Sequence, residues 1–378
     1  MEHSNHLFSK LFVTRGSGHC SALTPLFVKQ CTIHFFGASV TAQKEGYTDH
    51  LIALFEKKTG IKHSFQKHGI GGTGLLFGLA NIEFATRKAA DITLLEYSSG
   101  DLNIGLTPLE LLEDLLTALV LKLKQSGTHV IILHNYRCDF AGEKGNVVRN
   151  IYDAVAQRFK LAIIANHEML EDVLANNHEL SEADFLRDVV HTTSEGSLVY
   201  AKHVYEVLKL LSNENPGEER NSDNPVINVE KYVNVTSQLP DLKFFSSSEV
   251  IVRSYTYPSN GYEFRYYDVS DNTMFRAQVT GLLLGVAFLS GPLTTWVDLY
   301  IDGQHKKRFR CFDQHSYFER YLLLPFVIFL NNNQVTIKCS EEVLDVTIAK
   351  NSHPDFIKPR RLKFAGFVGE GLIFKAIS

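Results

Sequence analysis

A serine and an Asp–His pair stand out in the sequence because together they could form a nucleophile and its base. Ser39 follows a run of apolar residues in the segment HFFGASVT. Asp188 and His191 lie three residues apart, so in a turn the carboxylate can hold the Nδ1 proton of the imidazole while Nε2 faces another loop. The three residues therefore predict acyl chemistry through a covalent serine intermediate. Taken singly, Ser39 also suits a turn or helix cap, and Asp188 and His191 also suit a surface pair.

The elements that must bring these residues together are predicted to be βα units. Between residues 31 and 211, short apolar runs alternate with longer amphipathic ones, as expected for helices around a parallel sheet. The predicted strands are Thr32–Phe36, His63–Gln66, Ile92–Tyr97, Val130–His134 and Leu161–Ile164. The predicted helices are Tyr47–Lys58, Leu76–Lys88, Pro108–Gln125, Asn146–Phe159 and Ser197–Leu211. Ser39 then lies beyond the carboxyl end of the first strand, where open parallel sheets bind ligands.

A glycine-rich loop, His68-Gly-Ile-Gly-Gly-Thr-Gly74, follows the second predicted strand. It satisfies the pattern G-x-G-x-x-G, and Glu96 closes the next strand about twenty residues on, as a dinucleotide-binding fingerprint requires. Two features argue against a nucleotide cofactor. The preceding strand is short and polar, and it is the second strand of the domain rather than the first.

Taken in this order, the residues resemble the SGNH (GDSL-type) hydrolase superfamily. The resemblance rests on Gly37-Ala-Ser39, the glycine loop, a turn after the third strand and Asp188-Val-Val-His191 before the last helix, and it covers residues 31–211. Members of this superfamily are esterases, lipases, carbohydrate deacetylases and sugar O-acetyltransferases on a flavodoxin-like three-layer α/β/α sandwich. The resemblance implies Ser39 as nucleophile, His191 as general base and Asp188 as its orienting group. It also implies an oxyanion hole formed by the backbone N–H groups of Ser39 and Gly72. No metal is expected, because the histidines show no i, i+4 or H-x-H pairing that would bind one.

One part of the family pattern is absent. Where SGNH enzymes have Gly-x-Asn-Asp after the third strand, this chain has Glu96-Tyr-Ser-Ser-Gly-Asp101, so Gly100 stands in place of the asparagine. Losing one oxyanion donor costs about 3 kcal/mol of transition-state stabilisation. The substitute donors that the sequence offers are Asn103 in the same loop and Asn135 after the fourth strand. Otherwise the change predicts a slow enzyme or a fold that has lost catalysis.

Composition and charge narrow the class of protein. The chain has 378 residues, 44% hydrophobic and 21% charged, which is typical of globular proteins and sufficient for two domains. A formal net charge of -4 without an extended basic tract argues against a nucleic-acid partner. The first thirty residues lack an apolar core behind a basic start, so we expect a cytoplasmic protein. The five cysteines show no paired spacing, which predicts reduced thiols.

The composition changes after residue 211 and predicts a second domain. Residues 212–225 are rich in Asn, Ser, Pro and charge, and we expect them to be a linker. From residue 226 to 378, short apolar runs predict an antiparallel β-sandwich of the jelly-roll type. Its predicted hairpin turns include Asp302-Gly303 and Asn331-Asn-Asn333.

Two further segments are assigned to this sandwich. The uncharged residues 278–296 are interpreted as two of its strands, joined at Ser290-Gly-Pro292, rather than as a membrane span. Residues 1–30 are expected to be an extension whose predicted strands, Leu11–Thr14 and Leu26–Lys29, pair with the sandwich.

These observations predict a serine esterase or deacetylase that removes ester-linked acyl groups, most simply O-acetyl groups, from a sugar or glycan without a cofactor. One alternative is a sugar O-acetyltransferase that uses the same residues and an acetyl donor such as acetyl-CoA. Another is a glycan-binding protein whose SGNH domain is inactive. The sandwich weakly resembles carbohydrate-binding modules and could hold a glycan near Ser39, or it could serve only packing or homo-oligomer formation.

Overall fold

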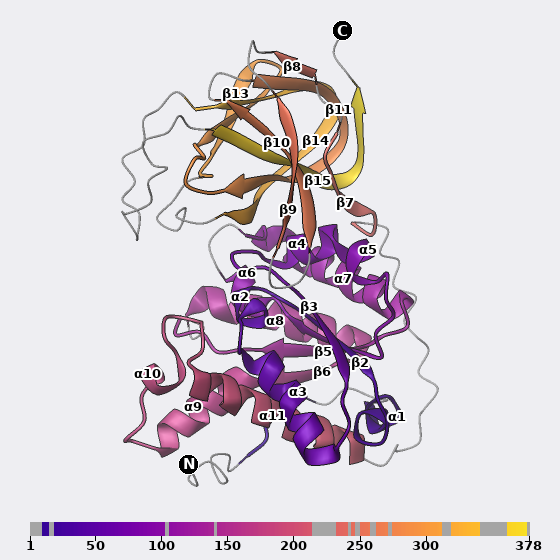
Figure 1. Ribbon diagram of the computed structural model, residues 1–378, viewed down its shortest axis with the longest axis vertical. Coiled ribbons are helices and arrows are strands. Elements are labelled where there is room, and N and C mark those ends of the chain that lie inside the picture. Colours follow the sequence, from indigo (N-terminus) through magenta and orange to yellow (C-terminus); the bar gives the residue numbers. More distant parts are fainter. Residues whose placement is uncertain are drawn as a thin grey trace. The chain divides into compact units, whose positions relative to one another are not determined.

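The computed structural model describes residues 10–14, 19–102, 106–139, 142–213, 232–240, 243–245, 250–257, 262–270, 274–311, 319–340 and 361–375. The chain divides into two compact units, an α/β unit up to Val233 and a β unit from Asn234 (Figure 1). Within the described residues, no helix is both long and apolar enough to cross a membrane.

The α/β unit contains a six-stranded sheet in the order β1-β6-β5-β4-β2-β3. Its parallel strands are β2 (Thr32–Gly37), β3 (Ser64–Gly69), β4 (Ile92–Glu96), β5 (His129–His134) and β6 (Ala162–Ala165). The short strand β1 (Val13–Thr14) pairs antiparallel with β6. The central strands β4 and β5 are mostly apolar and almost entirely buried because helices cover both faces of the sheet. The predicted α/β fold with a parallel sheet is confirmed.

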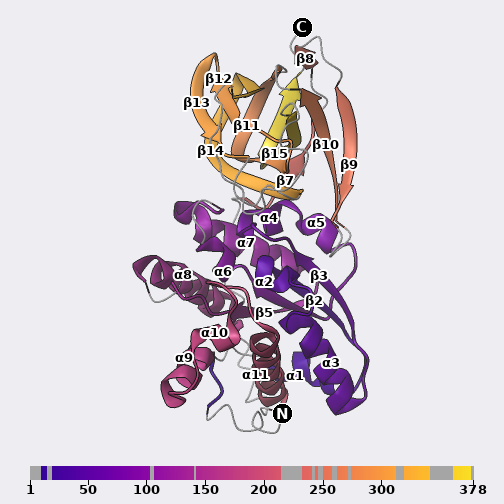
Figure 2. The same cartoon turned by 60° about the vertical axis from the view of Figure 1, so that its left-hand side comes forward.

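The helices form the outer two layers of this unit. They are α1 (His19–Leu23), α2 (Ser39–Ala42), α3 (Tyr47–Thr59), α4 (Leu75–Ala80), α5 (Ile82–Ala85), α6 (Ser98–Asp101), α7 (Leu112–Gln125), α8 (Glu143–Phe159), α9 (Asn166–Asn176), α10 (Glu182–Phe185) and α11 (Ser194–Asn213), with 3-10 turns η2 (Thr24–Phe27) and η3 (Leu109–Leu111). Helices α3 and α11 pack together on one face, and α4, α7 and α8 lie on the other (Figures 1 and 2).

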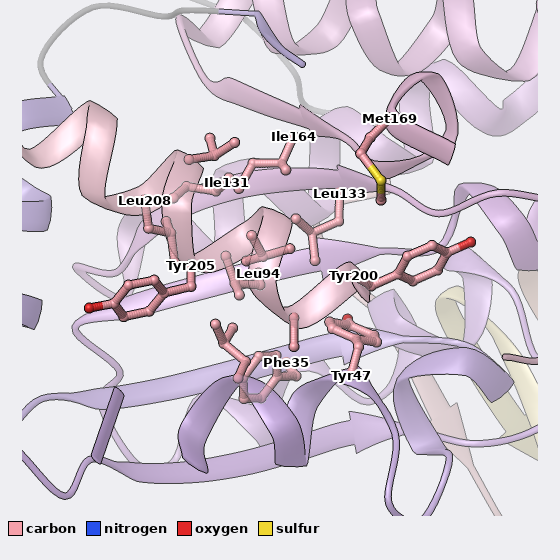
Figure 3. Close-up of a cluster of buried hydrophobic side chains, with 14 of the residues drawn as sticks. Phe35, Tyr47, Leu94, Ile131, Leu133, Ile164, Met169, Tyr200, Tyr205 and Leu208 are labelled. Carbon is pink, nitrogen blue, oxygen red and sulfur yellow. The ribbon is translucent and has the colours of Figure 1, made fainter. Parts of the chain in front are cut away.

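The core of the first face shows why the strands and helices alternate in the sequence. Figure 3 shows Phe35, Leu94, Ile131 and Ile164, from four parallel strands, facing Tyr200, Tyr205 and Leu208 of α11. These side chains are at most 5% exposed. Fully burying one large apolar side chain stabilises a fold by roughly 1.5–3 kcal/mol, so this layer holds the sheet in place beneath the site.

Two helix predictions need correction. The predicted helix Leu76–Lys88 is two helices, α4 and α5, separated at Asn81, whose Nδ2 donates to the carbonyl of Phe77 at 2.9 Å. Such a side-chain bond to a backbone carbonyl competes with regular helix. The helix predicted from Pro108 begins as the 3-10 turn η3 and becomes α-helical only at Leu112.

The described N-terminal residues, 10–14 and 19–30, belong to the α/β unit, so for them the prediction of pairing with the sandwich is wrong. Strand β1 extends the sheet beyond β6, and the N–H of Ala165 donates to the carbonyl of Phe12 at 3.1 Å. The segment Leu26–Lys29, predicted to be a strand, has its first two residues in the 3-10 turn η2 instead. Pro25 explains the turn, because proline has no N–H to donate to a sheet and its fixed φ suits the start of a helix.

The predicted linker falls only partly within the described residues. Residues 212 and 213 are the last two of α11, and residues 214–225 lie outside the described part of the chain.

The β unit is a nine-stranded antiparallel sheet that forms a β-sandwich, as predicted. Its strands are β7 (Val235–Gln238), β8 (Lys243–Phe245), β9 (Ile251–Thr256), β10 (Glu263–Ser270), β11 (Met274–Ser290), β12 (Val297–Ile301), β13 (Gln304–Phe309), β14 (Arg320–Cys339) and β15 (Arg361–Lys375). Figure 2 shows that the long strands β11, β14 and β15 are curved. They contribute Phe275, Leu330 and Phe364, among others, to a buried apolar cluster. Gly281, at φ +121°, lies at an irregularity in the pairing of β11 with both neighbours.

The predicted turns of the sandwich have different outcomes. Asp302-Gly303 is the turn between β12 and β13, and both residues have the positive φ that a tight hairpin requires. Asn331-Asn-Asn333 is not a hairpin, because it lies inside the continuous 20-residue strand β14. Asn332 takes a positive φ there, and the N–H of Asn331 donates to Oδ1 of Asn333 at 2.7 Å. The asparagines therefore make a local irregularity in one strand.

Candidate active site

Ser39 lies at the carboxyl edge of the parallel sheet, where β2 gives way to α2. The N–H of Ala38 still donates to the carbonyl of Glu96 in β4, at 3.3 Å. Gly37 lets the chain turn immediately afterwards, because a Cβ at this position would overlap Oγ1 of Thr41. Ser39 is consequently half-buried rather than enclosed in the core.

Asp188 and His191 lie in the loop between α10 and α11. Nδ1 of His191 is 2.8 Å from Oδ2 and 3.0 Å from Oδ1 of Asp188. Oδ1 also accepts the N–H groups of His191, at 2.8 Å, and Val190, at 3.0 Å. Burial alone would raise the pKa of Asp188, but these N–H groups and the imidazole ring lower it. The carboxylate thus holds Nδ1 and leaves Nε2 as the basic atom.

Two hydrogen bonds tie this loop to the sheet edge that carries Ser39. Nε2 of Gln43, the residue after α2, donates to the carbonyl of Thr192 at 3.0 Å. The N–H of Cys138, beyond β5, donates to the carbonyl of Val189 at 3.1 Å. Within the described residues, Ser39 and His191 are not hydrogen-bonded to each other, and catalytic hydrogen bonds often shorten only when substrate binds.

The glycine loop after β3 lies against the serine. An ideal Cβ on Gly71 would be 3.6 Å from Cβ of Ser39. Gly72 has φ +75°, which other residues adopt only with strain. The loop is closed by Oγ1 of Thr73, which donates to the carbonyl of Ile70 at 2.7 Å. The structure therefore places the loop that contains Gly72 beside Ser39.

The sequence matches no protein-family model and no curated protein. Among solved structures, a two-domain esterase described as active on acetylated mannans is similar, with a TM-score of 0.71 and 15% identity over 94% of this chain and 96% of that chain. A structure of a two-domain esterase co-crystallised with mannopentaose gives a TM-score of 0.66 and 14% identity over 96% of each chain. The protein shares the fold of these structures, a three-layer α/β/α unit followed by a β-sandwich. At this identity the likeness establishes the fold, and residue roles rest on the geometry.

Within the α/β unit, Gly100 is closely packed and leaves no open space for a side chain. It belongs to α6, and an ideal Cβ would lie 2.7 Å from both Cβ of Ala38 and the carbonyl oxygen of Thr73. Real Cβ atoms essentially never come so close. An asparagine at this position therefore has no room unless the turn that carries Ser39 or the glycine loop moves.

Of the two substitute donors suggested by the sequence, the structure places Asn135 only. Asn135 is fully buried, and its Oδ1 accepts Nδ2 of Asn166 at 2.7 Å, so this amide belongs to the interior rather than to a substrate-facing wall. Asn103 lies outside the described residues.

Sequence reasoning missed the role of Glu96, which it weighed only as a nucleotide ligand. Its carboxyl is fully buried and accepts hydrogen bonds from Oγ1 of Thr41, at 3.1 Å, and from Oγ of Ser99. The carboxyl is therefore not available to a ribose. The signal in the sequence was the acidic residue at the end of the predicted strand, whose other residues are apolar or threonine. Burying a carboxyl at such a position costs free energy unless hydrogen-bond partners are present.

Proposed function

We propose that the protein is a serine esterase that removes ester-linked acyl groups, most simply O-acetyl groups, from a sugar or glycan. The observation that carries this proposal is the hydrogen-bonded Asp188–His191 pair on a loop joined to the nucleophile segment through Gln43. The fold likeness to an esterase described as active on acetylated mannans, over 94% of this chain, supports the glycan substrate.

In the proposed reaction, Oγ of Ser39 attacks the ester carbonyl while Nε2 of His191 removes its proton. Asp188 keeps the imidazole in the tautomer that has a basic Nε2 and stabilises the imidazolium. The backbone N–H groups of Ser39 and Gly72 bind the oxyanion. His191 returns the proton to the sugar oxygen, which leaves as an alcohol. Water, deprotonated by His191, then hydrolyses the acyl-enzyme, releases acetate and restores Ser39.

An oxyanion hole of two backbone donors predicts a slow enzyme. Each missing donor costs about 3 kcal/mol, which corresponds to a rate roughly 100-fold or more below that of a complete site. The close packing around Gly100 supports the view that this loss is built into the fold.

A sugar O-acetyltransferase is the second candidate, favoured by the same absence of an asparagine at Gly100. It would form the same acyl-enzyme from a donor such as acetyl-CoA and transfer the acetyl group to a sugar hydroxyl instead of water. A glycan-binding protein with an inactive α/β unit is the third candidate, because a site with fewer donors can persist without turnover.

The test measures acetate release from p-nitrophenyl acetate and acetylated mannan by wild type, Ser39→Ala and His191→Ala. Turnover that both substitutions abolish supports the esterase. Acetylated sugar formed from acetyl-CoA and an added acceptor, at a rate above acetate release, supports the transferase instead. A background rate common to all three proteins rejects both enzymes and leaves glycan binding.

We further propose that the sandwich holds the glycan, with subunit packing as the equal alternative. The test uses the full chain with Ser39→Ala. This protein is titrated with deacetylated mannan oligosaccharides, and binding to the β unit is measured. Binding supports it, and its absence together with a dimeric mass in solution supports packing. The cytoplasmic location stays a prediction, which fractionation of expressing cells tests.

A further inference from the structure

The carboxyl of Glu96 joins two turns that the sequence keeps far apart. Oγ1 of Thr41, in α2, donates to Oε2 at 3.1 Å across 55 residues. Oγ of Ser99, in α6, donates to Oε1. Oγ1 of Thr41 is also 3.1 Å from the hydroxyl of Tyr47, so the Thr41 hydroxyl is bonded on two sides. All of these side chains are buried.

Each partner of Glu96 adjoins a part of the candidate site. Thr41 lies two residues after Ser39, on the same turn of chain. Ser99 precedes Gly100, the residue that packs against Ala38 and the carbonyl of Thr73. The carbonyl of Ser99 is held in turn by Nη1 of Arg137 at 3.0 Å. Glu96 therefore connects the nucleophile turn to the turn that normally carries the third oxyanion donor.

We propose that Glu96 is a positioning residue, whose carboxyl locks the Ser39 turn onto α6 and so fixes the direction of the Ser39 hydroxyl and backbone N–H. This proposal rests on the proposed serine chemistry. The reason is geometric. Each backbone donor that binds the oxyanion must point correctly, and a displacement of about 1 Å at a reacting group can cost on the order of 100-fold in rate.

The surroundings of Glu96 make its charge sensitive to pH. Burial is the main influence and raises its pKa to about 7, opposed by the hydrogen bonds from Ser99 and Thr41, while nearby Asp101 raises the pKa further. The other titratable groups that face it are the hydroxyls of Tyr47, Tyr152 and Tyr200. A carboxyl that changes charge near neutrality gives the proposal a readout that a purely structural role lacks.

The first experiment uses Thr41, because valine keeps its shape and serine keeps its hydroxyl. We expect Thr41→Val to lower kcat for p-nitrophenyl acetate about 10- to 100-fold, with KM within about twofold, because only alignment is lost. Thr41→Ser should restore kcat to within about threefold of wild type. The matched control is Thr93→Val, in the same strand β4 as Glu96. It removes the 2.9 Å bond between the hydroxyls of Thr93 and Thr128, at the other end of the strand, and should leave kcat unchanged.

The second experiment compares the pH dependence of kcat in wild type and Glu96→Gln. Glutamine cannot ionise, so the curve should change shape around pH 7 as well as fall. Unchanged kcat in Thr41→Val, or a Glu96→Gln curve with the wild-type shape, overturns the proposal. Ser39→Ala separates the two hypotheses. If it abolishes turnover while the Thr41 and Glu96 variants behave as wild type, the esterase stands and only the positioning role fails.

Discussion

The turn that carries Ser39 and the loop that carries Asp188 and His191 are held in place in opposite ways. The turn that carries Ser39 is held by buried contacts distant in sequence, such as the bond from Thr41 to Glu96 across 55 residues. The Asp188–His191 pair is made by residues three apart, and the Asp188 side chain is 48% exposed. The Asp188–His191 pair is thus assembled locally, whereas the position of Ser39 depends on the packing of the whole sheet edge. Substitutions on the two sides should therefore differ in their effect on stability.

The largest effect is expected at the reacting atoms themselves. Ser39→Ala and His191→Ala should each reduce acetate release by about 10⁴-fold or more, because no other group supplies the nucleophile or the base. Rates from purified variants, with folding checked by circular dichroism, make the measurement. Retention of a substantial part of the wild-type rate by either variant would contradict the assignment.

A substitution in the loop that carries Asp188 and His191 should lower the activity of the protein without lowering its stability. Asp188→Asn should lower kcat by about 10³-fold, because the amide no longer holds the correct imidazole tautomer. The free energy of unfolding should change by less than about 1 kcal/mol, since the pair is exposed to solvent. Urea titration and initial rates measure both. The matched control for activity is Asp184→Asn, at a carboxylate that accepts the N–H and the hydroxyl of Ser181 and does not contact His191. A large loss of stability would show that the loop is not locally built.

The buried carboxyl of Glu96 should make the stability of the protein depend on pH. The pKa of Glu96 is raised to about 7 in the folded protein from an ordinary value of 4.5, so the folded state binds the proton more tightly. Its contribution to stability is present below pH 4.5 and is lost as pH rises through 7. Wild type should thus lose on the order of 3 kcal/mol relative to Glu96→Gln between pH 4.5 and pH 8. The measurement is denaturant unfolding of both proteins at a series of pH values. A difference in unfolding free energy that stays constant with pH would contradict this prediction.

The smallest predicted effect concerns the packing around α6. Gly100→Ala should cost about 1–3 kcal/mol of unfolding free energy and lower kcat, because the added methyl group forces apart α6, the nucleophile turn and the glycine loop. Gly142→Ala is the control, since its Cβ would lie 3.5 Å from the nearest atom, an ordinary contact. A fully stable and active Gly100→Ala protein would show that this part of the site is loosely packed.

Much of the architecture was predictable because it depends on local patterns. The alternation of apolar strands and amphipathic helices located all five parallel strands to within a few residues. Asp302-Gly303 located a hairpin because both of its residues tolerate positive φ. The asparagines at 331–333 were misleading, since the same tolerance also suits an irregularity within a strand, and only pairing with β11 decides which occurs.

The sequence by itself determined the chemistry that the site can offer. A serine after the first parallel strand and an Asp–His pair three residues apart predict the proposed nucleophile and base from residue type and spacing. The tertiary structure alone decided that Gly100 has no room for a side chain, that Asn135 lies in the interior, and that Glu96 is buried between Thr41 and Ser99. The physical reason is that close packing and burial arise from segments tens of residues apart, whose contacts no local pattern specifies.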